Sequence, residues 1–308
     1  MMLHVLLLTV GFVFLVKGAD WFVEGAAGIA KKLGIPQLVI GLTIVAMGTS
    51  MPEAAVSITS ALSGSAGISI GNVVGSNILN ILIILGITAV LTNVRIQKTT
   101  FRYEIPFMIG ITIILMAFGI TGNQITFLEG ILFWLLFLIF LGYLFVISKK
   151  GSVQDEEEIK ELPLWKGVLG IIIGGILVVK GSDFAVEGAT EIARYFGMSE
   201  RFIGLTIVAF GTSLPELVTS VTAARRGNAG IAIGNIVGSN IFNILFVIGT
   251  TALICNVPFD QKFVIDTIVA IFSGVLLWAG TIRYKELRKN CGIVMLLCYA
   301  GYFIYLCK

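Results

Sequence analysis

The sequence has little of what most enzymes and metal sites use. Only 13% of its 308 residues are charged, and His4 is its single histidine. The four cysteines all lie in the last quarter of the chain and form no CxxC pair: Cys255, Cys291, Cys298 and Cys307. This spacing, without a nearby histidine, argues against a zinc or redox role for them. Soluble domains have about 25% charged residues, so an ordinary soluble protein is excluded as well.

What the chain has in quantity is apolar sequence. Hydrophobic residues make up 57% of it, and its mean hydropathy is +0.99. About ten runs are long enough to cross a bilayer as helices, so we predict an all-α polytopic membrane protein. The net charge of +3 is spread over short loops, which points to no nucleic-acid partner. The runs lie near residues 3–29, 36–62, 67–91, 103–121, 126–148, 165–192, 200–224, 230–254, 263–282 and 291–307.

One stretch occurs twice, and the chain is organised around it. Residues 41–86 and 204–249 align without a gap at an offset of 163 residues, and about 30 of 46 positions are identical. Both copies contain Gly-Thr-Ser-x-Pro-Glu, followed by Gly-Asn-x-x-Gly-Ser-Asn-Ile-x-Asn. Convergent hydrophobic sequence would not keep these motifs in register, so the chain contains an internal duplication.

Each copy places a carboxylate beside helix breakers inside an apolar run. Glu53 follows Pro52, and Glu216 follows Pro215. Proline removes a backbone hydrogen-bond donor, so we expect each span to be broken there. Broken helices at membrane depth are tolerated where they line a cavity or bind an ion. An ionisable residue in such a place is a functional-site hypothesis.

The number of spans predicts the topology. Five spans per copy force the second copy to insert upside down relative to the first, as in many secondary transporters. We therefore predict a first five-helix repeat at 1–148, a charged cytoplasmic linker at 149–164 and a second, inverted repeat at 165–308. Most lysines and arginines fall in loops on one side, which is then cytoplasmic. Both termini of this multi-pass cell-membrane protein would face outward.

Polar residues of the motifs share helix faces with one another. Thr49 and Glu53 are four residues apart, as are Ser76 and Asn80, and this spacing puts each pair on one face. If the broken spans cross, the two carboxylates meet among hydroxyls, amide oxygens and free carbonyls. Such an all-oxygen site suits a hard cation such as Ca²⁺ and disfavours zinc or copper. The second copy repeats the spacing at Thr212/Glu216 and Ser239/Asn243.

A charged segment outside the motifs is also repeated. Val16-Lys-Gly-Ala-Asp20 recurs as Val179-Lys-Gly-Ser-Asp183, in the long first and sixth spans. We expect the charges of both segments to make interhelical or interfacial polar contacts.

At the two motifs the chain resembles the alpha repeats of the cation/Ca²⁺ exchanger (CaCA) superfamily, and specifically its prokaryotic sodium/calcium exchangers. The resemblance covers both repeats, the ten-span plan and the outward amino terminus. It implies antiport of Na⁺ against Ca²⁺ by alternating access, with several Na⁺ exchanged per Ca²⁺ and net charge movement. It also implies that the long first and sixth spans slide across a rigid core. We expect the protein to work as a monomer in the lipid bilayer, without a cofactor.

Carried over by position, the resemblance implies a set of ion ligands. Glu53 and Glu216 would chelate Ca²⁺ with the carbonyls of Thr49 and Thr212, and would help to bind Na⁺ when Ca²⁺ is absent. Some members of the family, including potassium-dependent ones, have an aspartate where this chain has Asn243, so we expect exchange that does not require K⁺. The remaining implied ligands are Ala46 (carbonyl), Ser50 and Ser76 for one Na⁺ site, Ala209 (carbonyl), Ser213 and Ser239 for its symmetric partner, and Asn80 with Asn243 at the centre.

Three other interpretations remain. A proton/Ca²⁺ exchanger of the same superfamily usually lacks the Thr-Ser pair before Pro-Glu, which this chain has twice. A cation channel can also use acidic residues along a pore, but it would show no counter-ion requirement. An intramembrane enzyme is the least favoured, because no HExxH, Gly-x-Ser-x-Gly or Walker motif lies in a suitable context.

Overall fold

The computed structural model describes residues 2–150, 162–198 and 209–306, and these residues are almost entirely helical. Eight of their helices are long and apolar enough to cross a membrane, or nine when one bent helix pair counts as a single span. The sequence predicts ten spans. The span expected at 200–224 begins outside the described residues, and its described part consists of two helices, Ala209–Gly211 and Leu214–Arg225.

The elements follow in chain order, with η for a π-helical segment. The first half comprises α1 (Met2–Leu33), α2 (Gln37–Ile40), η1 (Gly41–Val45), α3 (Ala46–Thr49), α4 (Met51–Leu62), α5 (Gly67–Leu79), η2 (Asn80–Leu85), α6 (Gly86–Leu91), β1 (Val94–Arg95), η3 (Thr100–Glu104), α7 (Ile105–Gly122), β2 (Gln124–Ile125) and α8 (Phe127–Lys150). The second half comprises α9 (Leu164–Tyr195), α11 (Ala209–Gly211), α12 (Leu214–Arg225), α13 (Ala229–Phe242), η5 (Asn243–Ile248), α14 (Gly249–Ile254), β3 (Val257–Pro258), α15 (Lys262–Thr281), β4 (Glu286–Leu287) and α16 (Lys289–Leu306).

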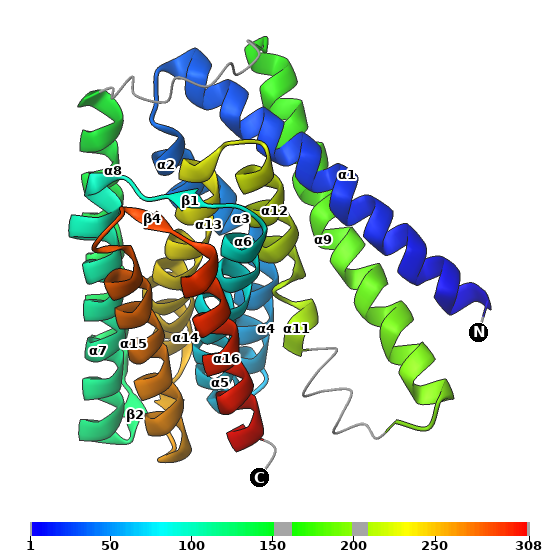
Figure 1. Cartoon of the computed structure of the whole chain (residues 1–308). Helices are drawn as coiled ribbons and strands as arrows, with labels where there is room; N and C mark the ends of the chain where they lie inside the picture. The colour runs from blue at the N-terminus through cyan, green and yellow to red at the C-terminus, as the bar shows by residue number, and fades with distance from the viewer. Residues whose placement is uncertain (1, 151–161, 199–208, 307–308) are drawn as a thin grey trace.

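Helices from the two copies form the centre of the bundle. In an apolar 18-residue window of the candidate span Ala229–Ile254, 94% of the residues are buried, and the figure for its copy Gly67–Leu91 is 78%. The equivalent windows of the other candidate spans have 11–33% of their residues buried. α13 packs against η1, α2, α3 and α12, and α5 packs against α4 and α15. In Figure 1, α7, α8 and α15 lie on one flank of this centre, and α1 with α9 lies on the other. The least buried helices therefore surround the two duplicated motifs.

α1 and α9 form a pair that leans across one flank of the bundle (Figure 1). They run antiparallel, because Gly11 faces Gly181 while Gly25 faces Gly167. Their backbones are so close that a Cβ added at Gly174 would lie 2.5 Å from the backbone nitrogen of Phe22. Small residues allow such close approach where lipid offers no hydrophobic driving force between helices. Glycine accordingly recurs every seven residues on both: Gly11, Gly18 and Gly25 on α1, and Gly167, Gly174, Gly181 and Gly188 on α9.

Turns at equivalent positions of the two copies share an uncommon backbone conformation. A residue with positive φ ends a helix so that the chain can reverse, and glycine adopts it without steric cost. Six such residues in the described part of the chain form three pairs, one member in each copy. The members of two pairs are separated by the 163-residue offset of the motifs, and those of the third pair by 162 residues. The duplication therefore extends beyond the motifs into the turns. The pairs are Gly34 and Gly197 (63° and 75°), Gly64 and Gly227 (77° and 79°), and Asn123 and Lys285 (51° and 52°).

Two short antiparallel strand pairs join loops at the ends of the bundle. Val94 of β1 pairs with Leu287 of β4, and Ile125 of β2 pairs with Val257 of β3. Because α7 connects β1 to β2, the two strand pairs lie at opposite ends (Figure 1). β1 and β3 are 163 residues apart, so they are equivalent strands of the two copies.

Each copy also contains a hydrogen bond between a carboxylate and a tyrosine of the next helix. The Tyr143 hydroxyl of α8 donates to Glu104 Oε1 at the end of η3. The Tyr302 hydroxyl of α16 donates to Asp266 Oδ1 of α15 at 2.8 Å. Glu104 and Asp266 are 162 residues apart, like Asn123 and Lys285. These bonds tie neighbouring outer helices together within each copy.

The described helices agree with the expected spans. Their ends lie within about four residues of the predicted boundaries, for example Lys262–Thr281 against 263–282. Helices of this hydropathy are apolar on all sides, so run length alone locates them.

The close contact between α1 and α9 can be tested with two neighbouring glycines. A Cβ at Gly174 would overlap the Phe22 backbone, whereas one at Gly175 would lie 3.7 Å from its nearest neighbour in the Phe22 ring. Overpacking costs about 1–3 kcal/mol, so we expect Gly174→Ala to lower the melting temperature in detergent by several degrees. Gly175→Ala should leave it unchanged. The melting temperature would be measured by tryptophan fluorescence on heating. Equal melting temperatures for the two variants would contradict an interface in which the two backbones are in contact.

Candidate cation-binding site

Each motif contains a helix break at the same serine. The helical run that ends with α3 is bent by 49° relative to α4. Ser50, between them, has φ −86° and ψ 7°, and Ser213 in the second copy has φ −93° and ψ 5°. Pro52 and Pro215 lie in the first turns of the helices that follow, and neither can donate the helical bond to the residue four positions back. The expected break is confirmed in the first copy, and the described part of the second has the same geometry.

The breaks place both carboxylates at the start of a helix in the interior. Glu53 lies in the first turn of α4 and Glu216 in the first turn of α12, and each is 1% exposed. They are close enough for their charges to interact. The positive end of a helix dipole favours a negative charge at this position. The Ser50 hydroxyl donates to Glu216 Oε1 at 2.9 Å, and because this bond crosses between copies, the two motifs form one site.

Four asparagines join the two copies at the centre. Asn77 and Asn240 donate to each other's backbone carbonyls, both at 3.1 Å. Asn80 donates to Asn240 Oδ1 at 2.9 Å, and Asn243 donates to Asn77 Oδ1 at 3.2 Å. Asn80 and Asn243 each begin a π-helical segment, a feature frequent at functional sites. The network uses the amide nitrogens of Asn80 and Asn243 and leaves their Oδ1 atoms for a ligand.

A second pair of asparagines supports the backbone beneath the carboxylates. Asn72 Nδ2 donates to the Glu53 carbonyl at 3.1 Å and to Ser57 Oγ at 2.9 Å. Asn235 makes the equivalent two bonds in the second copy, at 3.4 and 2.9 Å. The Thr49 hydroxyl also donates to Asn235 Oδ1 at 3.0 Å. These bonds hold α5 against α4, and α13 against α12, where the carboxylates begin.

The other predicted site residues lie on the same four stretches. The Ser239 hydroxyl donates to the Ala46 carbonyl at 3.4 Å, again across the copies, and the Ser76 hydroxyl interacts with Glu53. Ala209 begins α11, and the half-buried Thr212 follows that helix, directly before the second break. The structure therefore brings Ala46, Ser50, Ser76 and Ser239 together with the two carboxylates, and it places Ala209 and Thr212 on the segment that leads into the second break.

Several oxygens at this centre are buried and have no hydrogen-bond partner among the residues that the structure describes. Buried polar atoms are normally paired, and oxygen ligands are those that hard cations prefer. Both copies contribute, and carboxylate oxygens and amide oxygens each occur as an equivalent pair. The donor set therefore fits a hard cation such as Ca²⁺ or Na⁺. The oxygens are Glu53 Oε2, Glu216 Oε2, Asn80 Oδ1, Asn243 Oδ1 and Ser213 Oγ.

Comparison with known proteins identifies the family. The sequence profile of the sodium/calcium exchanger protein family matches residues 3–146 and 166–308. The chain belongs to this family. The putative antiporter CaxA of Alkalimonas amylolytica is 38% identical over 98% of this chain and 98% of its own length. Sodium/calcium exchanger MaX1 of Methanosarcina acetivorans is 32% identical over 98% of this chain and 97% of its own length.

The fold of a solved exchanger is similar throughout. The sodium-calcium exchanger NCX_Mj, soaked with 2.5 mM Na⁺ and 1 mM Sr²⁺, superposes with a TM-score of 0.86 at 33% identity. The superposition covers 99% of this chain and 98% of that one. The family resemblance inferred from the two motifs is thereby confirmed, and the chain has the helical membrane fold of an antiporter family.

Sequence reasoning missed the supporting asparagines of this exchanger-family site. Asn72 and Asn77, with their copies Asn235 and Asn240, are part of the motifs, but no role follows from their spacing alone. A signal was available, because each is an amide inside an apolar span and is identical in both copies. Buried amides need hydrogen-bond partners, which could have indicated contacts between the repeats.

Asn77→Ala and Asn240→Ala test the asparagine network. Each variant removes a donor to the partner copy. Asn77→Ala also removes the acceptor for Asn243, and Asn240→Ala removes the acceptor for Asn80, so the amide that lost its acceptor is no longer held in one orientation. An unpaired buried group costs about 1–3 kcal/mol, so we expect Ca²⁺ binding, measured by calorimetry in detergent, to weaken roughly 5- to 150-fold. Both variants should lose a similar factor. Asn123→Gly, at a turn far from the motifs, is the control. Unchanged affinity in either folded variant would contradict the assignment.

Proposed function

We propose that the protein is a secondary active antiporter that exchanges Na⁺ for Ca²⁺ across the cell membrane by alternating access. The observation that carries this proposal is the pair of interacting carboxylates, Glu53 and Glu216, each 1% exposed in the centre of a membrane bundle. Two such charges repel unless a divalent cation or several monovalent cations neutralise them. A site that one Ca²⁺ or several Na⁺ can fill, but not both together, couples the two fluxes.

The ligand roles follow the two-fold arrangement of the motifs. Ca²⁺ binds between both carboxylates, with the carbonyls of Thr49 and Thr212 completing an oxygen shell. Na⁺ ions occupy flanking positions that share the same carboxylates, so their binding excludes Ca²⁺. The Na⁺ ligands are Ala46 (carbonyl), Ser50 and Ser76 on one side, Ala209 (carbonyl), Ser213 and Ser239 on the other, and Asn80 and Asn243 border the centre.

The proposed architecture is ten transmembrane helices in two inverted repeats, 1–148 and 165–308, joined by a cytoplasmic linker at 149–164 that lies largely outside the described residues. Two observations support it: the equivalent strands β1 and β3 lie at opposite ends of the bundle, and the positive-φ turns recur at a nearly constant offset. α1 begins and α16 ends at the same end (Figure 1), as an even number of spans requires. The distribution of basic residues makes that end the outward one.

The proposed moving element is the α1–α9 pair, because its glycine contacts make it one body that can slide over the asparagine-linked centre. Several Na⁺ per Ca²⁺ carry net charge, so transport is electrogenic. All proposed ligands come from one chain, which supports a functional monomer without a cofactor.

A proton/Ca²⁺ exchanger is the nearest alternative, because buried carboxylates can also bind protons. The Ser50 hydroxyl is bonded to Glu216, and the Ser213 hydroxyl has no partner within the described residues. Both favour Na⁺, since a metal ion needs several oxygen ligands and a proton needs one. Ca²⁺ uptake into vesicles loaded with Na⁺ or with choline separates the two. A cation channel would conduct Ca²⁺ in both cases.

Glu53→Gln and Glu216→Gln should each abolish Na⁺-driven Ca²⁺ uptake into proteoliposomes. The amide keeps the shape of the side chain but removes half of the negative charge that a divalent cation requires. Glu104→Gln is the matched control, because that buried carboxylate is bonded to Tyr143 outside the site, and it should retain exchange. Near-normal uptake by a folded Glu53 or Glu216 variant would refute the proposal.

Na⁺-driven Ca²⁺ uptake should not require K⁺. A further monovalent cation at the centre would lack a counter-charge, because Asn243 provides oxygen without charge, and burying an uncompensated charge is unfavourable. Uptake would be compared with K⁺ present or replaced by choline on both sides, at equal Na⁺ gradients and with the voltage clamped by an unrelated ionophore. A strong dependence on K⁺ would show that the role of the Asn80 and Asn243 pair is misassigned.

A further inference from the structure

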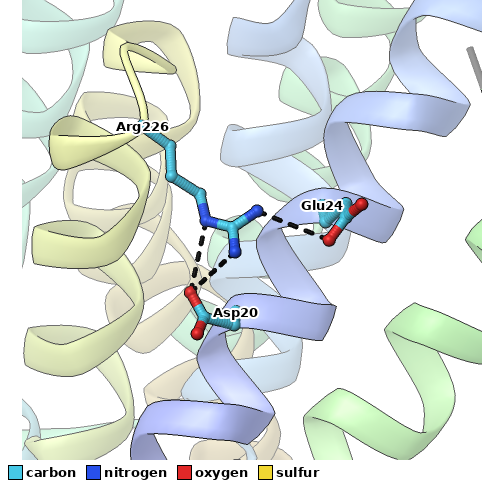
Figure 2. A network of polar contacts seen from close by, with 3 residues as sticks. All are labelled: Asp20, Glu24 and Arg226. Atoms are coloured by element: carbon cyan, nitrogen blue, oxygen red, sulfur yellow. Dashed lines mark hydrogen bonds and ion pairs between the residues drawn. The ribbon is translucent and has the colours of Figure 1, made fainter. Parts of the chain in front are cut away.

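One arginine links the α1–α9 pair to the centre of the bundle. Arg226, the residue that caps the C-terminus of α12, contacts two carboxylates of α1 (Figure 2). Its Nη2 and Nε lie 2.8 and 3.2 Å from Asp20 Oδ1, and its Nη1 lies 3.5 Å from Glu24 Oε2. Asp20 and Glu24 are one helical turn apart, so one guanidinium spans both. The expected interhelical contact of Asp20 is therefore confirmed.

The other copy has the carboxylates but lacks the arginine. The 163-residue offset relates Asp20 and Glu24 to Asp183 and Glu187 on α9, and it relates Arg226 to Ser63, the residue that caps α4. Asp183 pairs instead with Lys180 of its own helix, at 3.2 Å. Because both residues belong to α9, this ion pair does not attach α9 to the centre of the bundle. Among the described residues, an ion pair that ties one of the two long helices to the centre is therefore present at the Arg226 end and absent at the equivalent Ser63 end.

The packing of the two helices differs in the same sense. α1 packs along α12, at the end where Arg226 lies, whereas α9 scarcely touches α4 among the described residues. Figure 1 shows the same difference: the N-terminal half of α1 stands away from α4, while its C-terminal half lies over the tops of α2 and α12. Among the described residues, the pair is thus docked through α1 on α12 at the Arg226 end, and α9 has no comparable contact with α4 at the other end.

We propose that Arg226, Asp20 and Glu24 form a one-sided latch that favours the conformation closed at the Arg226 end, the cytoplasmic end in the proposed topology. This inference rests on the proposed alternating access. An exchanger built from two equivalent copies has no intrinsic reason to prefer either facing state. A latch present in one copy only gives it a preference, and in the opposite conformation the contact must separate.

The strength of the latch follows from its exposure. The side chains of Arg226, Asp20 and Glu24 are 37%, 32% and 43% exposed. Exposed ion pairs are weak and are screened by salt, so the latch shifts the ratio of the two conformations about two- to five-fold. It does not lock the transporter in one conformation.

The test measures conformation directly, by the distance between nitroxide labels on Val5 of α1 and Leu62 of α4. Both residues are exposed, by 47% and 70%, at the end away from Arg226. The full chain would be used in proteoliposomes with Na⁺ and no Ca²⁺, after replacement of Cys255, Cys291, Cys298 and Cys307. Arg226→Ser should raise the population with a short distance two- to five-fold, and high salt should reproduce this change in the wild type. Asp20→Asn with Glu24→Gln, which alters the other helix, should match Arg226→Ser.

Moving the arginine provides the sharpest comparison. Ser63→Arg places a guanidinium opposite Asp183 and Glu187, so the double variant Arg226→Ser with Ser63→Arg should invert the wild-type preference. Arg225→Ser and Lys180→Gln remove neighbouring charges outside the latch and should leave the distances unchanged. If Ca²⁺ changes the distances but none of the latch variants does, the latch is wrong and the proposed exchange stands. If neither ions nor variants change them, both the latch and alternating access are wrong.

Discussion

Two negative charges buried at one point inside a membrane are the constraint on which the rest of the structure depends. Glu53 and Glu216 are 1% exposed, and none of the ion pairs within residues 2–150, 162–198 and 209–306 includes either of them. Hydroxyls, amides and helix N-termini stabilise these charges in part. A net charge in such surroundings remains unfavourable, so a cation is the natural completion of the site. The helix breaks serve this purpose by presenting carboxylates and backbone oxygens at the same depth.

Duplication builds the site in halves. Each copy contributes one carboxylate, one break and two supporting asparagines, and the bonds that matter most cross between copies, such as Ser50 to Glu216 and Asn77 to Asn240. In the proposed ligand set, neither half is complete. In the proposed inverted arrangement, which the equivalent strands at opposite ends of the bundle support, the two halves approach the centre from opposite directions. A movement that opens a path along one copy can therefore close the equivalent path along the other.

Much of this could be predicted from the sequence, for identifiable reasons. Run length located the helices, because lipid requires about 20 apolar residues per span, and Pro52 located the break, because proline cannot donate. Identity at a constant offset indicated that Glu53 and Glu216 share one site. The partners of Asn77 and Asp20 could not be predicted. Helices that are apolar all round carry no periodic signal for their rotation, and which side chains meet depends on that rotation and on the crossing angle.

The π-helical segments that begin at Asn80 and Asn243 were also beyond sequence reasoning, because no residue pattern distinguishes them from regular helix. They show where tertiary contacts override local preference. A wide turn changes the direction of the side chain at its start, and in both copies that side chain is an asparagine bonded across the repeat interface. The cross-copy bonds and the π segments are therefore best understood as one feature that fixes the amide oxygens at the centre.

The interfaces of the bundle differ in strength, and under the proposed alternating access this difference decides where movement can occur. The α1 and α9 backbones touch at their glycines, and the centre is joined by buried amide bonds, so both resist separation. The contact of α1 with α12 instead includes half-exposed charges, which contribute about 0.2–1 kcal/mol. Reversing a two-state population from 1:99 to 99:1 requires about 5.5 kcal/mol. A contact of this size can bias the proposed transport cycle toward one side without stopping it, so the weakness of the contact is compatible with turnover.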